Sequence, residues 1–429
     1  MKQRLFCYYG DDFTGSTDAL EALASNGVET VLFLDPPSDE MLARFPEARA
    51  IGVAGESRSR DPEWMSAHLA PIFTRLAELR AGICQYKVCS TFDSSPSVGS
   101  IGRALEIGQD VFGVPWVPLV VAAPHLGRYV LFGNLFATGG GAVHRIDRHP
   151  TMRCHPVTPM DEADLRVHLG RQTARRLELL DVLALTSDDP EKKLDALLRA
   201  NPAAVLFDGL DERTQRATGR LLWDLRPAQH AFAVGSSGLI QALAYCWRER
   251  GEIPEAGAAQ QGAAGAVDRL AVISGSCAPA TEGQIRWAAR NGYADIRVSL
   301  AGCDASAYLD AALAALSRGQ SVVLYTALGA SDRAAGEGGQ KLGRKLGALL
   351  RDLLLRSSVR RAVVAGGDTS SHAVRQLGIA ALTFAGLTVP GAPLCRCHAP
   401  QHALEGLELV LKGGQIGPEN FFEMVRKPK

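Results

Sequence analysis

The chain has 429 residues, of which 46% are hydrophobic, so it is long enough to bury the cores of two or three domains. Lys and Arg together number 46 and balance 46 Asp and Glu, which leaves a formal net charge of zero. This neutrality disfavours proteins that coat nucleic acids or bind anionic membranes. Abundant glycine (44 residues) and few aromatic residues (6%) favour an α/β enzyme over a β-sandwich.

Signals for membranes and secretion are missing from the sequence. The longest apolar run, residues 114–124, is interrupted by prolines and falls short of the roughly 20 residues that span a bilayer. The first residues do not resemble a signal peptide. The nine cysteines are odd in number and irregularly spaced, which is typical of reduced thiols. We therefore expect a cytoplasmic protein that contacts neither membranes nor nucleic acids.

The N-terminal segment predicts a strand, a turn, a helix and a second strand. Residues 4–9 are apolar, residues 10–15 form a tight glycine-bounded turn, and a helix begins near Ser16. Residues 29–34 predict the second strand. We interpret this order as a βαβ unit.

The pattern continues along the first half of the chain, where polar residues collect just after several predicted strands. These strands are expected at residues 50–54, 83–88, 116–123, 204–208 and 231–235, with a helix at 65–80. Ligands bind at the carboxyl ends of strands in open parallel sheets, so the polar residues there are candidates for a binding site.

A second domain is predicted after a Gly-, Ala- and Gln-rich linker at residues 251–267. Its strands are expected at residues 270–273, 321–325 and 361–365, and its helices at 281–291 and 339–355 and from 372 onward. The fold class is therefore α/β, with two domains (residues 1–250 and 268–429) that each contain a mainly parallel sheet.

Three glycine turns follow predicted strands of the second domain. They comprise Ser274, Gly275 and Ser276, then Gly366, Gly367, Asp368 and Thr369, and finally Lys412, Gly413 and Gly414. Glycine lets the backbone approach a phosphate closely, and a helix N-terminus offers free N–H groups to it. Each turn alone is equally consistent with a capped strand-to-helix connection, but three in one domain favour a nucleotide phosphate site.

Charged residues gather at the predicted strand ends of the first domain. Asp11 and Asp12 are adjacent carboxylates that could hold polyol hydroxyls or a metal, or accept the proton of an attacking alcohol. The alternative is a solvated turn. The cations at other strand ends are Arg58, Arg60, Lys87, His125 and Arg128. Beside the carboxylates they suit a small hydroxy acid, although each alone could be a surface charge.

Other polar clusters favour no metal site. Cys395, Cys397, His398 and His402 lack a second cysteine pair, so we interpret them as a loop with buried thiols. Residues 144–155 are rich in His and Arg and predict a loop over the active site. Residues 338–345 lack the ending of a P-loop, and no dinucleotide fingerprint follows a strand, which disfavours an oxidoreductase.

Taken together, these motifs resemble the four-carbon acid sugar kinase family over nearly the full length. The matching segments are residues 10–15, 57–60, 235–239, 274–277, 366–369 and 412–414. One element departs from the family pattern Lys-x-Asp-Ser-Thr-x-Arg-Gly. Lys87, Ser90 and Thr91 match it, but Cys89 replaces the acid and Asp93 with Ser94 replaces Arg-Gly. Asp93 could restore the missing negative charge, and the departure favours a subgroup with an altered acceptor.

The resemblance implies an ATP-dependent sugar-acid kinase. The first domain would bind the acid and the second ATP, with Mg²⁺ bridging the phosphates and the active site in the cleft between the domains. Family members phosphorylate threonate, erythronate or 3-oxo-tetronates, and relatives act on acids such as 3-oxo-isoapionate. Thr14, Gly15, Ser90, Thr91 and Asp93 join the substrate-binding residues named above.

Some alternatives remain open at this stage. Either Asp11 or Asp12 could be the catalytic carboxylate that orients or deprotonates the attacking hydroxyl. A non-catalytic sensor that binds a nucleotide and a sugar acid is the alternative function. The sequence does not determine which sugar acid is the substrate, nor whether the chain forms a homo-oligomer.

Overall fold

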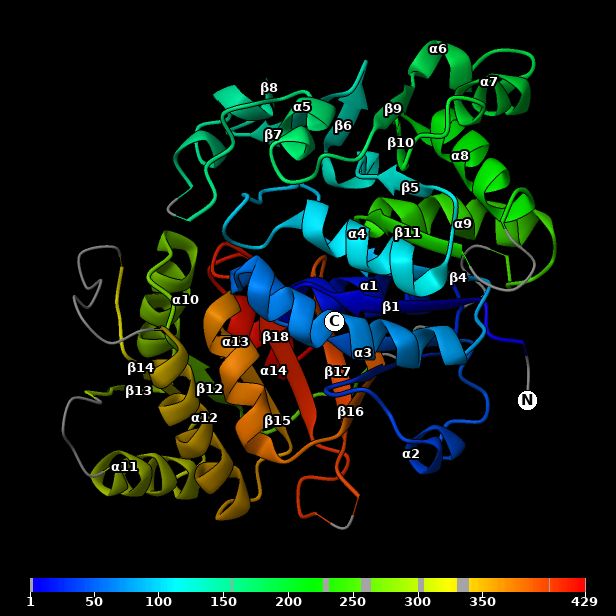
Figure 1. The fold of residues 1–429 in the computed structure, drawn as a ribbon. Helices are drawn as coiled ribbons and strands as arrows, with labels where there is room; N and C mark the ends of the chain where they lie inside the picture. Colours follow the sequence, from blue (N-terminus) through cyan, green and yellow to red (C-terminus); the bar gives the residue numbers. More distant parts are fainter. Residues whose placement is uncertain are drawn as a thin grey trace. The chain divides into compact units, whose positions relative to one another are not determined.

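The computed structural model describes residues 3–155, 157–226, 231–255, 264–299, 305–329, 339–400 and 402–428 (Figure 1). The chain divides into two compact units, each with its own α/β architecture. The first comprises Met1–Thr30 and Pro36–Ala259, and the second comprises Val31–Asp35 and Gln260–Lys429. Residues 256–263 of the predicted linker lie outside the described residues.

The first unit is built on a parallel sheet with the strand order β3-β1-β4-β11-β5-β10-β9. Its strands are β1 (Phe6–Gly10), β3 (Ala50–Ala54), β4 (Ile83–Lys87), β5 (Val117–Val120), β9 (Leu177–Leu180), β10 (Ala204–Phe207) and β11 (Ala231–Gly235). The central strands are buried along their whole length because helices cover the sheet. This is why they read as continuous apolar runs in the sequence.

Two groups of helices pack on this sheet. The helices of the unit are α1 (Phe13–Ser25), α2 (Asp39–Ala43), α3 (Pro62–Glu78), α4 (Ile101–Phe112), α5 (Leu165–Gly170), α6 (Val182–Leu185), α7 (Pro190–Leu198), α8 (Glu212–Asp224) and α9 (Ser237–Glu249). Helix α3 contacts α4, and the pair lies in front of the strands in Figure 1. Helix α9 contacts both α1 and α8.

A small antiparallel sheet interrupts the first unit between β5 and β9. Its strands are β6 (Arg128–Leu131), β7 (Asn134–Gly139) and β8 (Ala142–Arg145). The buried Asp208 carboxylate at the end of β10 accepts hydrogen bonds from the N–H groups of Phe132 (2.6 Å) and Gly133 (3.0 Å), which anchors the β6–β7 turn to the main sheet. The sequence did not predict this sheet.

The second unit has a mixed sheet with the strand order β13-β14-β12-β15-β18-β17-β16-β2. Its strands are β2 (Thr30–Phe33), β12 (Ala271–Ser274), β13 (Ala294–Arg297), β14 (Val322–Tyr325), β15 (Arg361–Ala365), β16 (Ala381–Val389), β17 (Ala392–His398) and β18 (Glu408–Lys412). The pairs from β13 to β18 are parallel, and the pairs from β18 to β2 are antiparallel. Its helices are α10 (Pro279–Arg290), α11 (Ser306–Ser317), α12 (Gly339–Leu355), α13 (Gly367–Val374) and α14 (Phe421–Arg426). The predicted fold class, two α/β domains with mainly parallel sheets, is confirmed.

The predicted order of residues 4–34, a strand, a turn, a helix and a second strand, is present as β1, α1 and β2. The parallel neighbours of β1 are β3 and β4, whereas β2 pairs antiparallel with β16 of the second unit, with Leu32 opposite Leu382. A short, fully buried apolar strand carries no signal for the strand that it pairs with, so the sequence did not predict the pairing of β2 with β16.

Two segments expected to be loops have regular structure. Cys395, Cys397 and His398 lie in β17, although both thiols are buried as expected. Residues 144–155 begin in β8 and continue through two 3₁₀ turns, Ile146–Arg148 and Met152–Cys154. Within the described part of the chain, no helix has the length and apolar character that a bilayer crossing would need.

Candidate active site

The first candidate site lies at the carboxyl edge of β3, β1 and β4. Gly10 is in register with Ala54 on one side and with Lys87 on the other, so the three strands end at the same level. The loops that follow are tied together by main-chain hydrogen bonds. Asp11 donates its N–H to the Lys87 carbonyl (2.9 Å), and Arg58 donates its N–H to the Asp11 carbonyl (3.0 Å). The parallel register thus gathers residues that are far apart in the sequence.

Asp12 has a structural role at the start of α1. It is the N-cap of the helix, and its Oδ1 accepts hydrogen bonds from the Gly15 N–H and from the Thr14 hydroxyl (3.1 Å). Its Oδ2 accepts from Arg58 Nη1 at 2.6 Å. Burial acts to raise the pKa of Asp12, but the Arg58 guanidinium and the Gly15 N–H outweigh it and lower that pKa. Asp12 is therefore held as a carboxylate.

Asp93 contacts Arg58, and both of its carboxylate oxygens accept hydrogen bonds. Both of its carboxylate oxygens accept from Arg58 Nη2 at 3.0 Å, and Oδ1 also accepts from the Thr91 hydroxyl at 2.6 Å. Burial opposes ionisation, but Arg58 and Thr91 lower the pKa of Asp93 to about 2. The Asp93 side chain is 0% exposed, so in this arrangement it orients Arg58 instead of facing a ligand.

Lys87 is buried at the end of β4 and forms an ion pair with Asp18 of α1, with Nζ 3.0 Å from Oδ2. Gly15 fits closely among these groups. A Cβ atom on Gly15 would lie 2.9 Å from Asp12 Oδ1, 3.5 Å from Lys87 Nζ and 3.6 Å from Asp11 Oδ1. The first turn of α1 can therefore approach the charged cluster only because residue 15 has no side chain.

Asp11 differs from the other carboxylates of the cluster. Its Oδ1 atom is buried and has no hydrogen-bond partner among the described residues. Burial, reinforced by the Asp12 charge, raises the pKa of Asp11 to about 7, although Arg58 and Lys87 oppose the shift. A carboxylate with an unpaired oxygen and a pKa near neutrality has the properties of a general base.

The remaining predicted residues of the first unit differ in position. Ser90 follows β4 and is half-buried. His125 is exposed; partial desolvation lowers its pKa, and the Asp18 charge opposes that shift, so the imidazole lies within electrostatic reach of the cluster. Arg60 instead pairs with Glu56 and stacks on Trp64.

Arg128 is engaged in its own hairpin. Its Nη1 atom donates to the carbonyl groups of Leu126 (3.0 Å), Gly127 (3.2 Å) and Thr138 (3.4 Å). These contacts support a role in the β6–β7 sheet, and no contact in the described residues ties its guanidinium to the carboxylate cluster.

The second candidate site lies at the carboxyl edge of β12, β15 and β18. Ala365 is in register with Ser274 on one side and with Lys412 on the other, so the three predicted glycine turns begin at the same level. Gly275 donates its N–H to the Ala365 carbonyl, and Gly366 donates to the Lys412 carbonyl at 2.9 Å. The turns that sequence analysis singled out are therefore neighbours.

The packing within this group explains why its glycines are needed. A Cβ atom on Gly275 would lie 2.4 Å from Thr369 Oγ1, and one on Gly414 would lie 2.6 Å from Ser276 Oγ. Gly366 has a φ of +115° and is the N-cap of α13, where no side chain caps the helix. Free N–H groups at that end suit an anion. The Asp368 side chain lies outside the described residues.

Sequence analysis missed two buried residues of α10 that hold this site together. The Thr281 hydroxyl donates to the Gly414 carbonyl at 2.6 Å and accepts from Lys412 Nζ at 3.0 Å. Gln284 Nε2 donates to the carbonyls of residues 416–418 at 2.9–3.1 Å. Burial lowers the pKa of Lys412 to about 8. Lys412 thus lies below the turn and supports it, and only the contacts in three dimensions reveal this.

The glycine turns fit a nucleotide phosphate, since a Cβ atom on Gly367 would meet no protein atom within 4 Å and leaves the backbone open. A protein-built metal cage is a poorer fit. The part of the chain that the structure describes holds no group of three or more His, Cys, Asp or Glu residues that could bind a metal ion. Magnesium needs only one or two protein ligands when phosphates supply the others.

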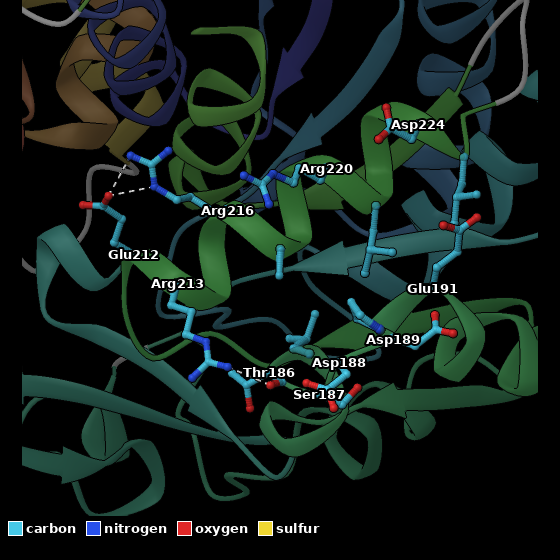
Figure 2. A pocket seen from close by; sticks show the side chains of 15 residues that line it. Thr186, Ser187, Asp188, Asp189, Glu191, Glu212, Arg213, Arg216, Arg220 and Asp224 are labelled. Atoms are coloured by element: carbon cyan, nitrogen blue, oxygen red, sulfur yellow. Dashed lines mark hydrogen bonds and ion pairs between the residues drawn. The ribbon is translucent and has the colours of Figure 1, made fainter. Parts of the chain in front are cut away.

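A groove elsewhere in the first unit is also charged. It is lined by acidic residues of the segment between α6 and α7, including Asp188 and Asp189, and by Arg213, Arg216 and Arg220 of α8 (Figure 2). Several of these charges already pair within the protein, since Arg216 and Arg220 contact Glu249. None of the predicted site residues lines this groove.

Comparison with known proteins identifies the class. Residues 6–243 match the sugar-binding N-terminal domain, and residues 271–422 match the nucleotide-binding C-terminal domain. The chain is similar to the 3-oxo-isoapionate kinase of Paraburkholderia graminis, with 48% identity over 99% of this chain and 94% of the relative. It is 32% identical to the 3-oxo-tetronate kinase of Methylobacterium radiotolerans over 96% of both chains.

The solved structures agree on the fold. A crystal structure from Salmonella typhimurium shares 26% identity and a TM-score of 0.79 over 98% of both chains. One from Haemophilus influenzae shares 22% identity and a TM-score of 0.73 over 98% of both chains. The class is thus a two-domain sugar-acid kinase that uses ATP. The chain belongs to the four-carbon acid sugar kinase family.

Substitution of Gly367 tests the nucleotide turn without disturbing the protein around it. Because the added methyl group meets no protein atom, Gly367→Ala should leave Tm unchanged. It should raise KM for ATP by about tenfold, equivalent to roughly 1.4 kcal/mol. Gly170→Ala, at an equally open position in the first unit, is the matched control and should change neither value. An unchanged KM for ATP in Gly367→Ala would place the phosphates elsewhere.

Substitution of Thr281 tests the support beneath that turn. Thr281→Val removes both hydrogen bonds of the hydroxyl and should lower the free energy of unfolding by roughly 1–3 kcal/mol. Isothermal titration should show weaker ATP binding, because the Gly414 carbonyl is no longer fixed. Thr281→Ser keeps the hydroxyl and should bind ATP like the wild type. Equal ATP affinity in the two variants would show that Thr281 does not support the site.

Proposed function

We propose that this protein transfers the γ-phosphoryl group of ATP to a hydroxyl of 3-oxo-isoapionate, with 3-oxo-tetronates as poorer acceptors. The choice of acid is supported by the higher identity to the 3-oxo-isoapionate kinase (48%) than to the 3-oxo-tetronate kinase (32%), both over nearly the whole chain. The altered Cys89–Ser94 element also favours an acceptor different from that of family members with the usual motif.

Asp11 is the proton acceptor in this proposal. The observation that carries it is the buried, unpaired Oδ1 atom of Asp11 on a carboxyl group whose pKa is about 7. A substrate hydroxyl placed at this oxygen would supply its missing hydrogen bond and pass its proton there as the new O–P bond forms. Asp12 is less suited, because its oxygens are already engaged by Gly15, Thr14 and Arg58.

The cations of the first unit orient the carboxylates and balance part of their charge. Arg58 is shared by Asp12 and Asp93, and Lys87 pairs with Asp18. Their remaining N–H groups, with Ser90 and His125, are the proposed contacts to the acid. Thr14, Gly15 and Thr91 shape the same edge, whereas we assign Arg60 and Arg128 no direct contact.

ATP supplies the phosphoryl group and binds, in this proposal, at the three glycine turns of the second unit. The N-terminus of α13, which begins at Gly367, presents main-chain N–H groups. Gly275, Gly366 and Gly414 let the three turns pack closely around it, and Thr369 adds a hydroxyl near them. Mg²⁺ would be held mainly by the phosphates. We place the enzyme in the cytoplasm, where ATP is available, and leave a homo-oligomer as a further proposal to be tested by light scattering.

Coupled ADP release tests the proposed activity directly. The purified protein with ATP and Mg²⁺ should turn over 3-oxo-isoapionate with a kcat/KM at least about tenfold above that of any tetronate, a preference of roughly 1.4 kcal/mol. Omission of Mg²⁺ should abolish turnover. Saturable binding of the acid without ADP release would instead support a sensor, and turnover of tetronates alone would overturn the choice of acid.

The two aspartates are separated by their pH profiles. Asp11→Asn should lower kcat by roughly 10²–10⁴-fold at pH 8 while ATP binding persists. In the wild type, kcat/KM should rise with pH through an apparent pKa near 7, as Asp11 ionises. Asp12→Asn should retain residual activity, and the rise of its kcat/KM with pH should occur at lower pH than in the wild type. The reason is that the Asp12 charge raises the pKa of Asp11.

A capping aspartate elsewhere provides the control. Asp61 caps α3 as Asp12 caps α1, and Asp61→Asn should leave the pH profile unchanged. Because a raised carboxyl pKa means that stability is lost as pH rises through about 7, Asp11→Asn should not lower Tm at pH 8. An Asp11→Asn enzyme with near-wild-type kcat would eliminate Asp11 as the base.

A further inference from the structure

The segment that departs from the family pattern is a strained turn. Phe92 is buried and has a φ of +55°, a left-handed conformation that is unfavourable for a bulky residue. Such strain persists only where the surroundings fix it, and it is frequent at functional sites. The contacts that fix this turn therefore point to residues that matter for the site.

These contacts come from residues 155–172, which follow the small antiparallel sheet. Ser94 lies 2.9 Å from His168 Nε2 and accepts from Gln172 Nε2 at 2.8 Å. Phe92 packs against the His168 ring. All these groups belong to the first unit, and Ser94 and Phe92 of the turn contact His168 and Gln172 of this segment.

Thr158 makes the contact closest to the site. Its hydroxyl is buried and donates to Asp93 Oδ2 at 3.0 Å. Its N–H donates to His155 Nδ1 at 3.1 Å. Because Nδ1 of His155 accepts that N–H, the proton of the Thr158 hydroxyl is left to Asp93, although His155 Nδ1 also lies 3.0 Å from the oxygen.

Asp93 passes this constraint to Arg58. The two carboxylate oxygens of Asp93 receive three side-chain partners, namely Arg58, Thr91 and Thr158. Arg58 Nη2 donates to both of these oxygens while Nη1 donates to Asp12, so the guanidinium is held at two of its nitrogens. The charge of Arg58 is one of those that set the proton affinity of Asp11.

We propose that Thr158 is a positioning residue for the phosphoryl-transfer reaction: through Asp93 it holds Arg58 in the orientation that prepares Asp11 and the acid-binding edge. This inference rests on the proposed function. It assigns a positioning role to the segment after the small sheet, which the sequence motifs do not cover.

The test compares Thr158→Val, which keeps the shape but removes the donor, with Thr158→Ser, which keeps the donor. Thr158→Val should lower kcat/KM for 3-oxo-isoapionate by roughly 10-fold or more, as expected when a hydrogen bond to a charged group is lost. KM for ATP should remain within about twofold of the wild-type value, a free-energy change of well under 1 kcal/mol. Thr158→Ser should restore most of the activity.

The pH profile separates positioning from a merely structural role. The charged groups that act on Asp11 are Asp12, Arg58, Lys87 and Asp93. Arg58 lowers the pKa of Asp11, so a loosened Arg58 should move the acidic limb of kcat/KM to higher pH in Thr158→Val. Thr158→Ser should keep the limb of the wild type.

Thr173→Val is the matched control. It removes another threonine hydroxyl that donates to a carboxylate in the same unit, Glu106 Oε1 at 2.7 Å, outside the charged cluster. It should change Tm but neither the kinetics nor the pH profile. Wild-type kinetics in Thr158→Val, or an equal loss in Thr173→Val, would overturn the inference. Failure of the wild type to release ADP would instead overturn the proposed function itself.

Discussion

The parallel register of three adjacent strands is the constraint on which both candidate sites depend. In the first unit Gly10 is level with Ala54 and Lys87, and in the second Ala365 is level with Ser274 and Lys412. Each strand feeds its loop toward the same edge, so loops separated by dozens of residues meet there. A slip of one residue in any of these strands would shift its loop along the edge and separate the groups that meet there, so the sites depend on this register.

The charge balance of the first site explains why one carboxyl group differs from its neighbours. Arg58 and Lys87 stand against Asp11, Asp12, Asp18 and Asp93, so the cations cannot compensate every carboxylate. Three of the four carboxylates have ion-pair partners. Asp11 has none among the described residues, and its pKa is raised. A carboxyl group with a pKa near neutrality thus follows from the balance of charges in the cluster, and its ionised form costs stability that the fold must supply elsewhere.

Local sequence signals predicted most of the elements and both groups of turns, since buried strands and glycine-bounded turns leave clear patterns. The start of α1 was predicted near Ser16, whereas the helix begins at Phe13. The N-cap, Asp12, had been interpreted only as a candidate catalytic or binding residue. The small sheet of residues 128–145 and the partner of β2 could not be predicted, because pairing over long separations has no local signature. Thr158, Thr281 and Gln284 were missed for the same reason: a lone polar residue in a predicted helix or loop gives no sign that it is buried against a distant carbonyl or carboxylate.

The two candidate sites differ in the groups that they present to a ligand. The first gathers charged side chains, and in the proposed mechanism one of them, with a pKa near neutrality, accepts the proton of a hydroxyl. The second, proposed as the phosphate site, offers glycine backbone and a helix N-terminus, whose partial charges do not titrate. Lys412 is buried, and its Nζ atom donates to the Thr281 hydroxyl. Its ammonium group therefore supports the turn at Gly414 through Thr281. Under the proposed function, Asp11 of the first unit gives the acidic limb of the pH profile, while the glycine turns of the second unit set the affinity for nucleotide.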